Sequence, residues 1–182
     1  MFACGIAAIF STVILAADGA AAPGIGKQLD GQIRSVEREV VSLAEAMPAD
    51  KYNFAPTGAA FEGVRTFSQQ MSHIAAVVYL VSSAAMGEKP IDPGPNENGP
   101  ATLDGKDAVV KYLKDAFAYA HKAANSLTDA NANELMPPPF GKNKTSRWSD
   151  IDVAVWHSFD HYGQAVVYAR MNGIVPPASR PQ

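Results

Sequence analysis

The sequence contains little cysteine and little histidine. Its 182 residues include one cysteine, Cys4, and four histidines. A single thiol cannot form a disulfide within the chain, so the fold must be stable without cross-links. Because Cys4 lies in the apolar N-terminal segment, the rest of the chain also has no cysteine nucleophile. With so few histidines, their placement becomes informative.

A strong excess of either charge is also missing. The chain carries 15 Lys and Arg against 18 Asp and Glu, a net charge of -3. Surfaces that bind nucleic acid or anionic lipid need clustered positive charge, so the composition argues against a nucleic-acid partner. The hydrophobic fraction of 47% and the charged fraction of 18% are typical of one globular domain with a single core.

An apolar stretch near the N-terminus stands apart from the rest of the chain. The stretch Phe2–Ala17 has no charged side chain and is too short for a comfortable transmembrane helix. Followed by small residues, it predicts a secretory signal over residues 1–22, although the usual basic start is missing. Residues 23–182 would then form the domain, periplasmic or secreted, with no stable membrane span after processing. The alternative is an apolar extension folded onto the domain of a cytoplasmic protein.

The sequence has no alternating strand pattern and no glycine motif for a dinucleotide or a phosphate. Four segments instead repeat apolar residues at intervals of three and four, which predicts amphipathic helices. The first lies within Gly24–Pro48 and has its apolar positions from Leu29 to Met47. The second begins at a capping box and closes at Gly87, the third spans about 106–127, and the fourth runs to Asn172, before Gly173. Thr66 with Gln69, and Ser149 with Asp152, resemble the capping starts of the second and fourth helices. These helices predict an all-α four-helix bundle.

Two long connections separate these helices. Residues 88–105 and 128–148 are rich in Pro, Gly and Asn and cannot be helical throughout. The first of them joins the second and third helices and is long for a turn between antiparallel neighbours. A crossover between two helices that run parallel explains this length better.

Three of the four histidines predict a metal site. His157 and His161 are four residues apart, so on a helix both point the same way and can reach one cation. The small side chains of Ala154 and Ala165 leave room beside them. A third ligand must come from a facing helix, and His73 on the second helix is placed for that. The alternative is that His73, His157 and His161 are ordinary core histidines.

Neither His121 nor Asp160 is predicted to bind the metal ion. His121 stands beside Lys122, which indicates a surface or structural role. Asp160 either orients one imidazole of the pair or is a surface carboxylate paired with a basic residue. No glutamate follows His157, which excludes the HExxH pattern of zinc proteases. The residues assign no catalytic acid, base or nucleophile.

Three stretches resemble a known family. MPADKYNFAPT, VRTFSQQMSHIA and HSFDHYGQAVVYARMNGIVPPAS, in this order and at these separations, closely resemble the DinB-like family, also called the DinB/YfiT-like family. The resemblance extends from about Gly26 to Ser179, and the histidines of the family fall on His73, His157 and His161. It implies an up-down-down-up bundle and a divalent metal ion, nickel or zinc, held by the three histidines. The remaining coordination positions would be open to water or substrate.

The resemblance also implies a range of activities. Some relatives transfer or isomerise substrates with thiols such as bacillithiol or mycothiol, so we expect a metal-dependent hydrolase or thiol-dependent transferase with an unknown small-molecule substrate. A non-catalytic metal- or ligand-binding bundle of the cell envelope is the main alternative, and a purely structural module is a third. Three imidazoles suit zinc, nickel, copper and iron alike. The oligomeric state, including a homodimer, stays open.

Overall fold

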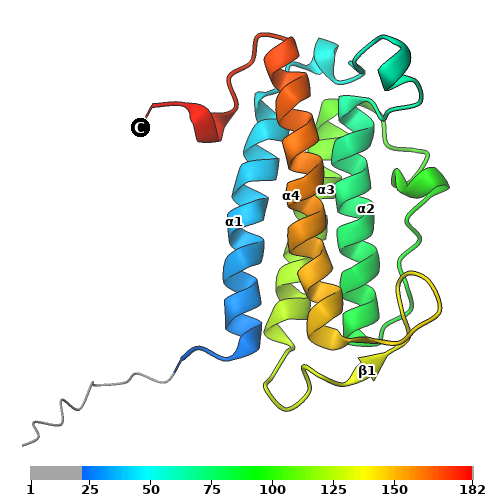
Figure 1. Ribbon diagram of the computed structural model, residues 1–182, viewed down its shortest axis with the longest axis vertical. Coiled ribbons are helices and arrows are strands. Elements are labelled where there is room, and N and C mark those ends of the chain that lie inside the picture. Colours follow the sequence, from blue (N-terminus) through cyan, green and yellow to red (C-terminus); the bar gives the residue numbers. More distant parts are fainter. Residues whose placement is uncertain (1–21, 182) are drawn as a thin grey trace, which may run out of the picture.

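The computed structural model describes residues 22–181, so the predicted signal segment lies outside the described residues apart from Ala22. Four long helices form a bundle (Figure 1). They are α1 (Ile25–Ala46), α2 (Phe67–Met86), α3 (Gly105–Asn125) and α4 (Arg147–Met171). Two-residue strands, β1 (Leu135–Met136) and β2 (Thr145–Ser146), pair antiparallel just before α4. The predicted all-α four-helix bundle is confirmed.

Contacts between helix ends give the direction of each helix. Glu88, just after α2, accepts hydrogen bonds from Tyr119 and Lys122 near the end of α3, so α2 and α3 run parallel. Lys106 at the start of α3 donates to the carbonyl of Glu45 at the end of α1 over 2.7 Å, so α1 and α3 are antiparallel. The bundle therefore runs up, down, down, up, with α1 and α4 in one direction (Figure 1).

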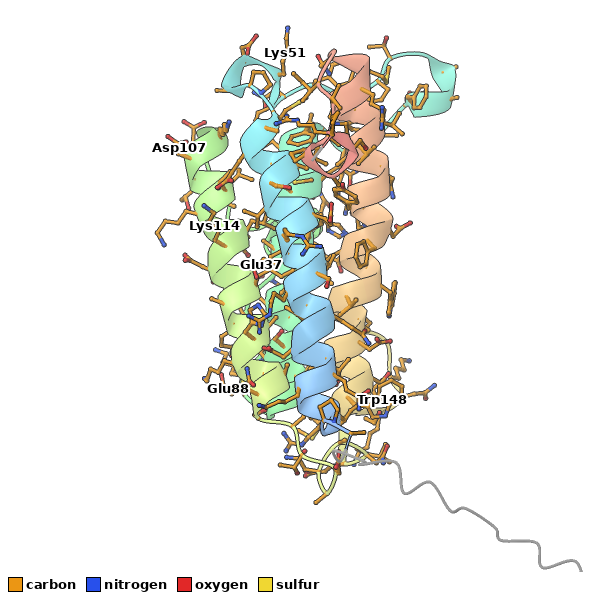
Figure 2. All side chains as sticks on the ribbon, turned by 90° about the vertical axis from the view of Figure 1, so that its left-hand side faces the viewer. Glu37, Lys51, Glu88, Asp107, Lys114 and Trp148 are labelled. Atoms are coloured by element: carbon orange, nitrogen blue, oxygen red, sulfur yellow. The ribbon has the colours of Figure 1, made fainter. Side chains whose placement is uncertain are left out.

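The side view supports the same arrangement. Lys51, after α1, and Asp107, at the start of α3, lie at one end of the bundle (Figure 2). Glu88 and Trp148 lie at the opposite end. The crossover, residues 88–104, returns along the outside of the bundle and includes a short 3-10 turn, Pro95–Glu97. This is the long parallel connection that the sequence predicts.

The predicted inner faces of the helices form the core. Helices α1 and α2 each pack against both α3 and α4, so α1 and α2 lie diagonally across the bundle. Burying each large apolar side chain stabilises the fold by about 1.5–3 kcal/mol. The largest fully buried side chains include Ile33, Leu43, Phe67, Met71, Ile74, Leu113, Phe117 and Ile151. Within residues 22–181, no helix combines the length and the apolar character needed to cross a membrane.

The predicted caps agree with the structure except at the start of α4, and α3 ends at Asn125, two residues before the predicted Leu127. The Thr66–Gln69 capping box is present, with hydrogen bonds of 3.2 and 2.9 Å. Gly173 is left-handed at φ 74°, as predicted for the end of α4. The predicted start of α4 at Ser149 is wrong, because the helix begins at Arg147 and Ser146 takes the N-cap position without a side-chain bond. There β2 leads directly into the helix, and the Arg147 guanidinium donates to the carbonyl of Ala85 over 2.6 Å.

Two glycines of α1 offer a matched test of packing. A Cβ at Gly26 would lie 2.6 Å from the carbonyl oxygen of Ala124 and 2.7 Å from that of Leu127, whereas a Cβ at Gly31 would meet nothing within 4 Å. We expect Gly26→Ala to lower the free energy of unfolding by about 1–3 kcal/mol, because the backbone of α3 must move. Gly31→Ala should raise it by about 0.5–1 kcal/mol through helix propensity. Thermal unfolding of both variants checks this, and equal effects would contradict the close contact between α1 and α3.

Candidate metal centre

Helices α2 and α4 bring the three predicted histidines together. One potential ligand atom from each of His73, His157 and His161 lies within 4.8 Å of the other two. The ring centroids are 4.5 Å apart for His157 and His161, 4.6 Å for His73 and His161, and 5.0 Å for His73 and His157. Between residues 22 and 181, no other three His, Cys, Asp or Glu side chains gather this closely. We call these three residues the histidine triad.

Two of the imidazoles are held by oxygen acceptors at Nδ1. His73 Nδ1 lies 2.8 Å from the backbone oxygen of Glu97, which can only accept, so this nitrogen donates. His161 Nδ1 lies 2.7 Å from Oε1 of Gln70, whose amide nitrogen donates to Gln164 over 3.1 Å. These bonds fix the tautomer with the proton on Nδ1 and leave each Nε2 with a free lone pair.

The third imidazole has no such partner. His157 Nδ1 is buried and has no hydrogen bond within the described part of the chain. Leaving a buried polar atom unpaired costs about 1–3 kcal/mol, and a cation is one partner that would satisfy an imidazole nitrogen. The donor set of three imidazoles also suits a divalent ion such as zinc or nickel. The triad therefore fits the metal that the sequence predicts.

The surroundings keep all three imidazoles neutral. Burial is the largest cause that lowers the pKa of His157 to about 3. Repulsion from His161 and His73 when they are protonated, and from Arg65, lowers it further. Burial, followed by His73, lowers the pKa of His161 to about 4. Burial also lowers the pKa of His73. Metal ligation requires deprotonated nitrogen, so the triad is ready to bind an ion near neutral pH.

The crossover supplies one of the two acceptors through an unusual turn. Asn96 and Glu97 are left-handed at φ 55° and 58°, a conformation that few residues other than glycine adopt. At Gly94 a Cβ would lie 1.9 Å from the carbonyl oxygen of Gly99, so the turn closes too tightly for a side chain there. Such strain is typical of functional sites, and here it places the Glu97 carbonyl at His73.

Neither His121 nor Asp160 bonds to an imidazole of the triad in the described structure. His121 bridges α1 and α3, with Nδ1 2.6 Å from Asp30 and Nε2 3.0 Å from Glu37, which confirms its structural role. Asp160 is exposed and accepts a 3.2 Å hydrogen bond from Gln164. The orienting role considered for Asp160 is therefore wrong, because the acceptors behind the imidazoles are Gln70 and the Glu97 carbonyl. The predicted pairing of Asp160 with a basic residue is also wrong, because its partner is the side-chain amide of Gln164.

The sequence patterns did not predict the two residues that accept hydrogen bonds from the triad, Gln70 and Glu97. Gln70 is buried one turn before His73, in a stripe of α2 that is otherwise mostly apolar. A polar residue in such a stripe is a usable signal, because buried amides need partners. Glu97 gave no signal, because it contributes through its backbone and from a loop.

Comparisons with known proteins agree with this architecture. The family model described as DinB superfamily matches residues 32–165. The fold is similar to the crystal structure of a conserved protein from Enterococcus faecalis, with a TM-score of 0.64 and 15% identity over 82% of this chain and 98% of that one. It is also similar to DinB-like proteins from Bacillus subtilis (TM-score 0.62, 18% identity, 85% of this chain and 99% of that one) and Bacillus cereus (0.64, 14%, 81% and 95%).

None of the curated proteins compared with this chain matches it. The structural matches share too little sequence to carry more than the fold. The family model, in contrast, covers most of the chain, including His73, His157 and His161. On this evidence the chain belongs to the DinB superfamily.

Proposed function

We propose that this protein is a divalent-metal-dependent enzyme of the hydrolase or thiol-dependent transferase type, with nickel or zinc held by His73, His157 and His161. The observation that carries the proposal is the triad itself: three buried or half-buried, neutral imidazoles with ligand atoms within 4.8 Å. A divalent ion bound there would act as a Lewis acid and lower the pKa of a water or a thiol.

The number of protein ligands favours a catalytic over a purely structural ion. Structural zinc sites usually have four protein ligands, whereas catalytic sites have three and an open position. Among the described residues, no fourth His, Cys, Asp or Glu joins the triad. Gln70 and the Glu97 carbonyl orient two of the rings through Nδ1. Three imidazole ligands would leave further positions on the ion for a substrate.

One observation favours the alternative, a bundle that holds a metal or small ligand without turnover. A cleft that includes Gln70, the acceptor for His161, is lined by Gly63, Val64, Arg65, Gln69, Gln70, Asn96, Asn98 and Gln164. None of these side chains is an ordinary general acid, base or nucleophile. Any chemistry must then come from the ion and the substrate alone.

A substrate screen separates the two functions. Metal-loaded protein would be tested against ester, amide and thiol-acceptor panels, each with and without a chelator. The proposal expects a turnover that disappears with chelator and in His157→Ala, and persists in His121→Ala. If metal-loaded protein turns over no substrate in any panel, the binding function is the better account.

Gln70 provides a test of how the site is supported. We expect Gln70→Met, which keeps the size but removes the acceptor for His161, to weaken zinc or nickel binding by about 10–100-fold. Competition with a chromophoric chelator measures this, with the exposed Gln32→Met on α1 as the control. Unchanged affinity in Gln70→Met would show that Gln70 does not orient His161.

We also propose export to the periplasm or outside the cell, supported by the apolar stretch Phe2–Ala17. Expression of the full chain should give a mature protein that begins near residue 23 in the exported fraction. N-terminal sequencing of the fractionated protein tests this, and an intact N-terminus in the cytoplasmic fraction would contradict it.

A further inference from the structure

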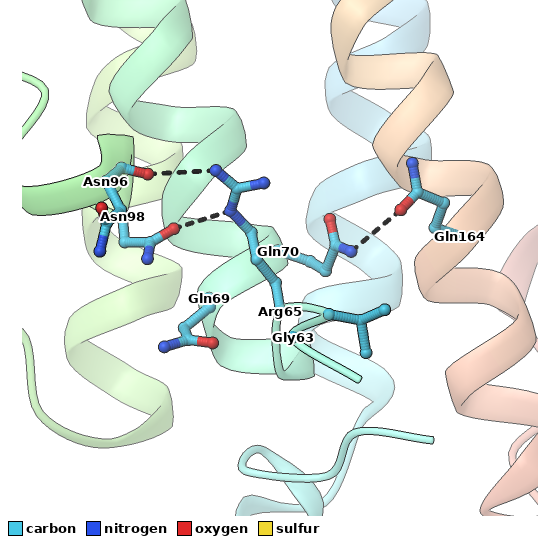
Figure 3. Close-up of a pocket in the computed structure, with 8 residues that line it drawn as sticks. Gly63, Arg65, Gln69, Gln70, Asn96, Asn98 and Gln164 are labelled. Carbon is cyan, nitrogen blue, oxygen red and sulfur yellow. Dashed lines mark hydrogen bonds between the residues drawn. The ribbon is translucent and has the colours of Figure 1, made fainter. Parts of the chain in front are cut away.

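The cleft lined by Arg65 and Gln70 carries a positive charge in a protein of net charge -3. It has a volume of about 490 Å³, within the range of sites for small molecules. Its only charged lining residue is Arg65, and the polar remainder are Gln and Asn side chains (Figure 3). Among the described residues no carboxylate lines the cleft, and that of Glu97 lies 3.9 Å from His73 Nδ1 at the triad. The charge of the cleft lining therefore favours an anion.

Arg65 has hydrogen-bonding capacity to spare. Its Nε donates to Oδ1 of Asn98 over 2.8 Å and one terminal nitrogen donates to the carbonyl of Asn96 over 3.1 Å. A guanidinium has five N–H donors, so three remain. Across residues 22–181, no carboxylate lies within 4 Å of Arg65. The crossover thus fixes the guanidinium without neutralising it.

The nearby amides also present donors rather than acceptors. Oε1 of Gln69 accepts from the backbone nitrogen of Thr66 over 2.9 Å as part of the capping box. Oδ1 of Asn98 accepts from Arg65. With both oxygens engaged, the NH₂ groups of Gln69 and Asn98 are left as donors. A cleft lined by an unneutralised guanidinium and by the amides of Gln69 and Asn98 is suited to an oxyanion.

The cleft is connected to the triad through shared residues. Gln70 lines the cleft and also accepts the hydrogen bond from His161. Asn96 lines it and precedes Glu97, whose carbonyl accepts from His73. The charge of Arg65 also contributes to the lowered pKa of all three imidazoles, as expected of a cation close to them.

We infer that the protein binds a small molecule with a carboxylate at one end, held by Arg65 with Gln69 and Asn98, and a metal-coordinating group at the other, directed to the triad. This inference rests on the proposed metal site and names the substrate class for it. A single fixed positive charge matches the single charge of a carboxylate better than the nearly double charge of a phosphate monoester. Arg65 is a specificity residue in this account, because it would bind the end of the substrate away from the ion.

Two thiols that differ only in charge test the inference. Cobalt-loaded protein is titrated with 3-mercaptopropionate and with uncharged 3-mercaptopropionamide, and the thiolate–cobalt absorption is followed. We expect the carboxylate to bind at least about tenfold more tightly. In Arg65→Gln the two thiols should bind about equally. The control Arg38→Gln, whose side chain is 74% exposed on α1 outside the cleft, should keep the preference.

The outcomes separate this inference from the function on which it rests. Equal binding of the two thiols to the parent protein, or a preference that persists in Arg65→Gln, overturns the carboxylate site alone. If the protein takes up cobalt but neither thiol changes its absorption, the carboxylate site is likewise overturned and the metal site stands. Failure to take up cobalt overturns both proposals. Helical circular dichroism and cobalt uptake of Arg65→Gln show that the variant is folded.

Discussion

Nickel or zinc should raise the melting temperature of the metal-free protein by about 8–16 °C, and His73→Ala should abolish the rise. A ligand that binds only the folded state at 1,000 times its dissociation constant stabilises it by about 4.1 kcal/mol. For a domain of this size, 1 kcal/mol corresponds to about 2–4 °C. His73 is the decisive position because it is the only triad member on α2, opposite the two on α4.

The shift upon adding metal, rather than the melting temperature itself, is the quantity to compare. His73 is 4% exposed, so His73→Ala also leaves a cavity that destabilises the metal-free state. His121→Ala is the matched control, since His121 binds Asp30 and Glu37 between α1 and α3. It should lower the melting temperature yet keep the full metal shift. A shift retained in His73→Ala would place the ion elsewhere.

Metal-free protein should lose about 4 kcal/mol of stability between pH 7 and pH 5 from two imidazoles alone. The pKa values of His157 and His161 in the folded state are about 3 and about 4, below the ordinary 6.5. As the pH falls below 6.5, the unfolded chain binds protons that the folded chain does not. Stability therefore falls, by at most about 1.4 kcal/mol per pH unit for each histidine, until the folded pKa is reached.

A double variant isolates this contribution from the carboxylates that titrate over the same range. His157→Gln with His161→Gln removes both titrating groups and keeps neutral side chains in their place. Its stability should fall much less steeply between pH 7 and pH 5, as measured by denaturant unfolding in metal-free buffer. If the double variant loses as much stability as the parent, the two imidazoles are not held neutral by burial.

Helical periodicity explains why most of this site could be predicted. A spacing of four residues places His157 and His161 on one face of a helix whatever the rest of the fold does. His73 lies in a helix that is buried over a wide arc, so its side chain was bound to face a neighbour. The parallel crossover also followed from the length and composition of residues 88–105. Each of these predictions depends on local pattern, which one sequence contains.

The residues that hold the imidazoles in place could not be predicted in the same way. The Glu97 carbonyl reaches His73 only because two consecutive residues adopt left-handed conformations in a loop. Gln70 was visible as a polar residue in an apolar stripe, but its partner His161 comes from a distant part of the sequence. Arg65 lies in a loop, and its position depends on hydrogen bonds to Asn96 and Asn98 of the crossover, which no local pattern predicts. The predicted start of α4 is wrong for a related reason, because β2 pairs with β1 and leads into the helix before the capping pattern at Ser149.

Calorimetric titration of metal-free protein with nickel, repeated with zinc, tests the central claim most directly. The account predicts one ion per chain for the parent protein and for His121→Ala. It predicts no binding of comparable affinity in a variant in which His73, His157 and His161 are all alanine, provided circular dichroism shows that its helices persist. One ion bound with unchanged affinity in that folded triple variant, or no ion bound by the parent protein, would contradict the account.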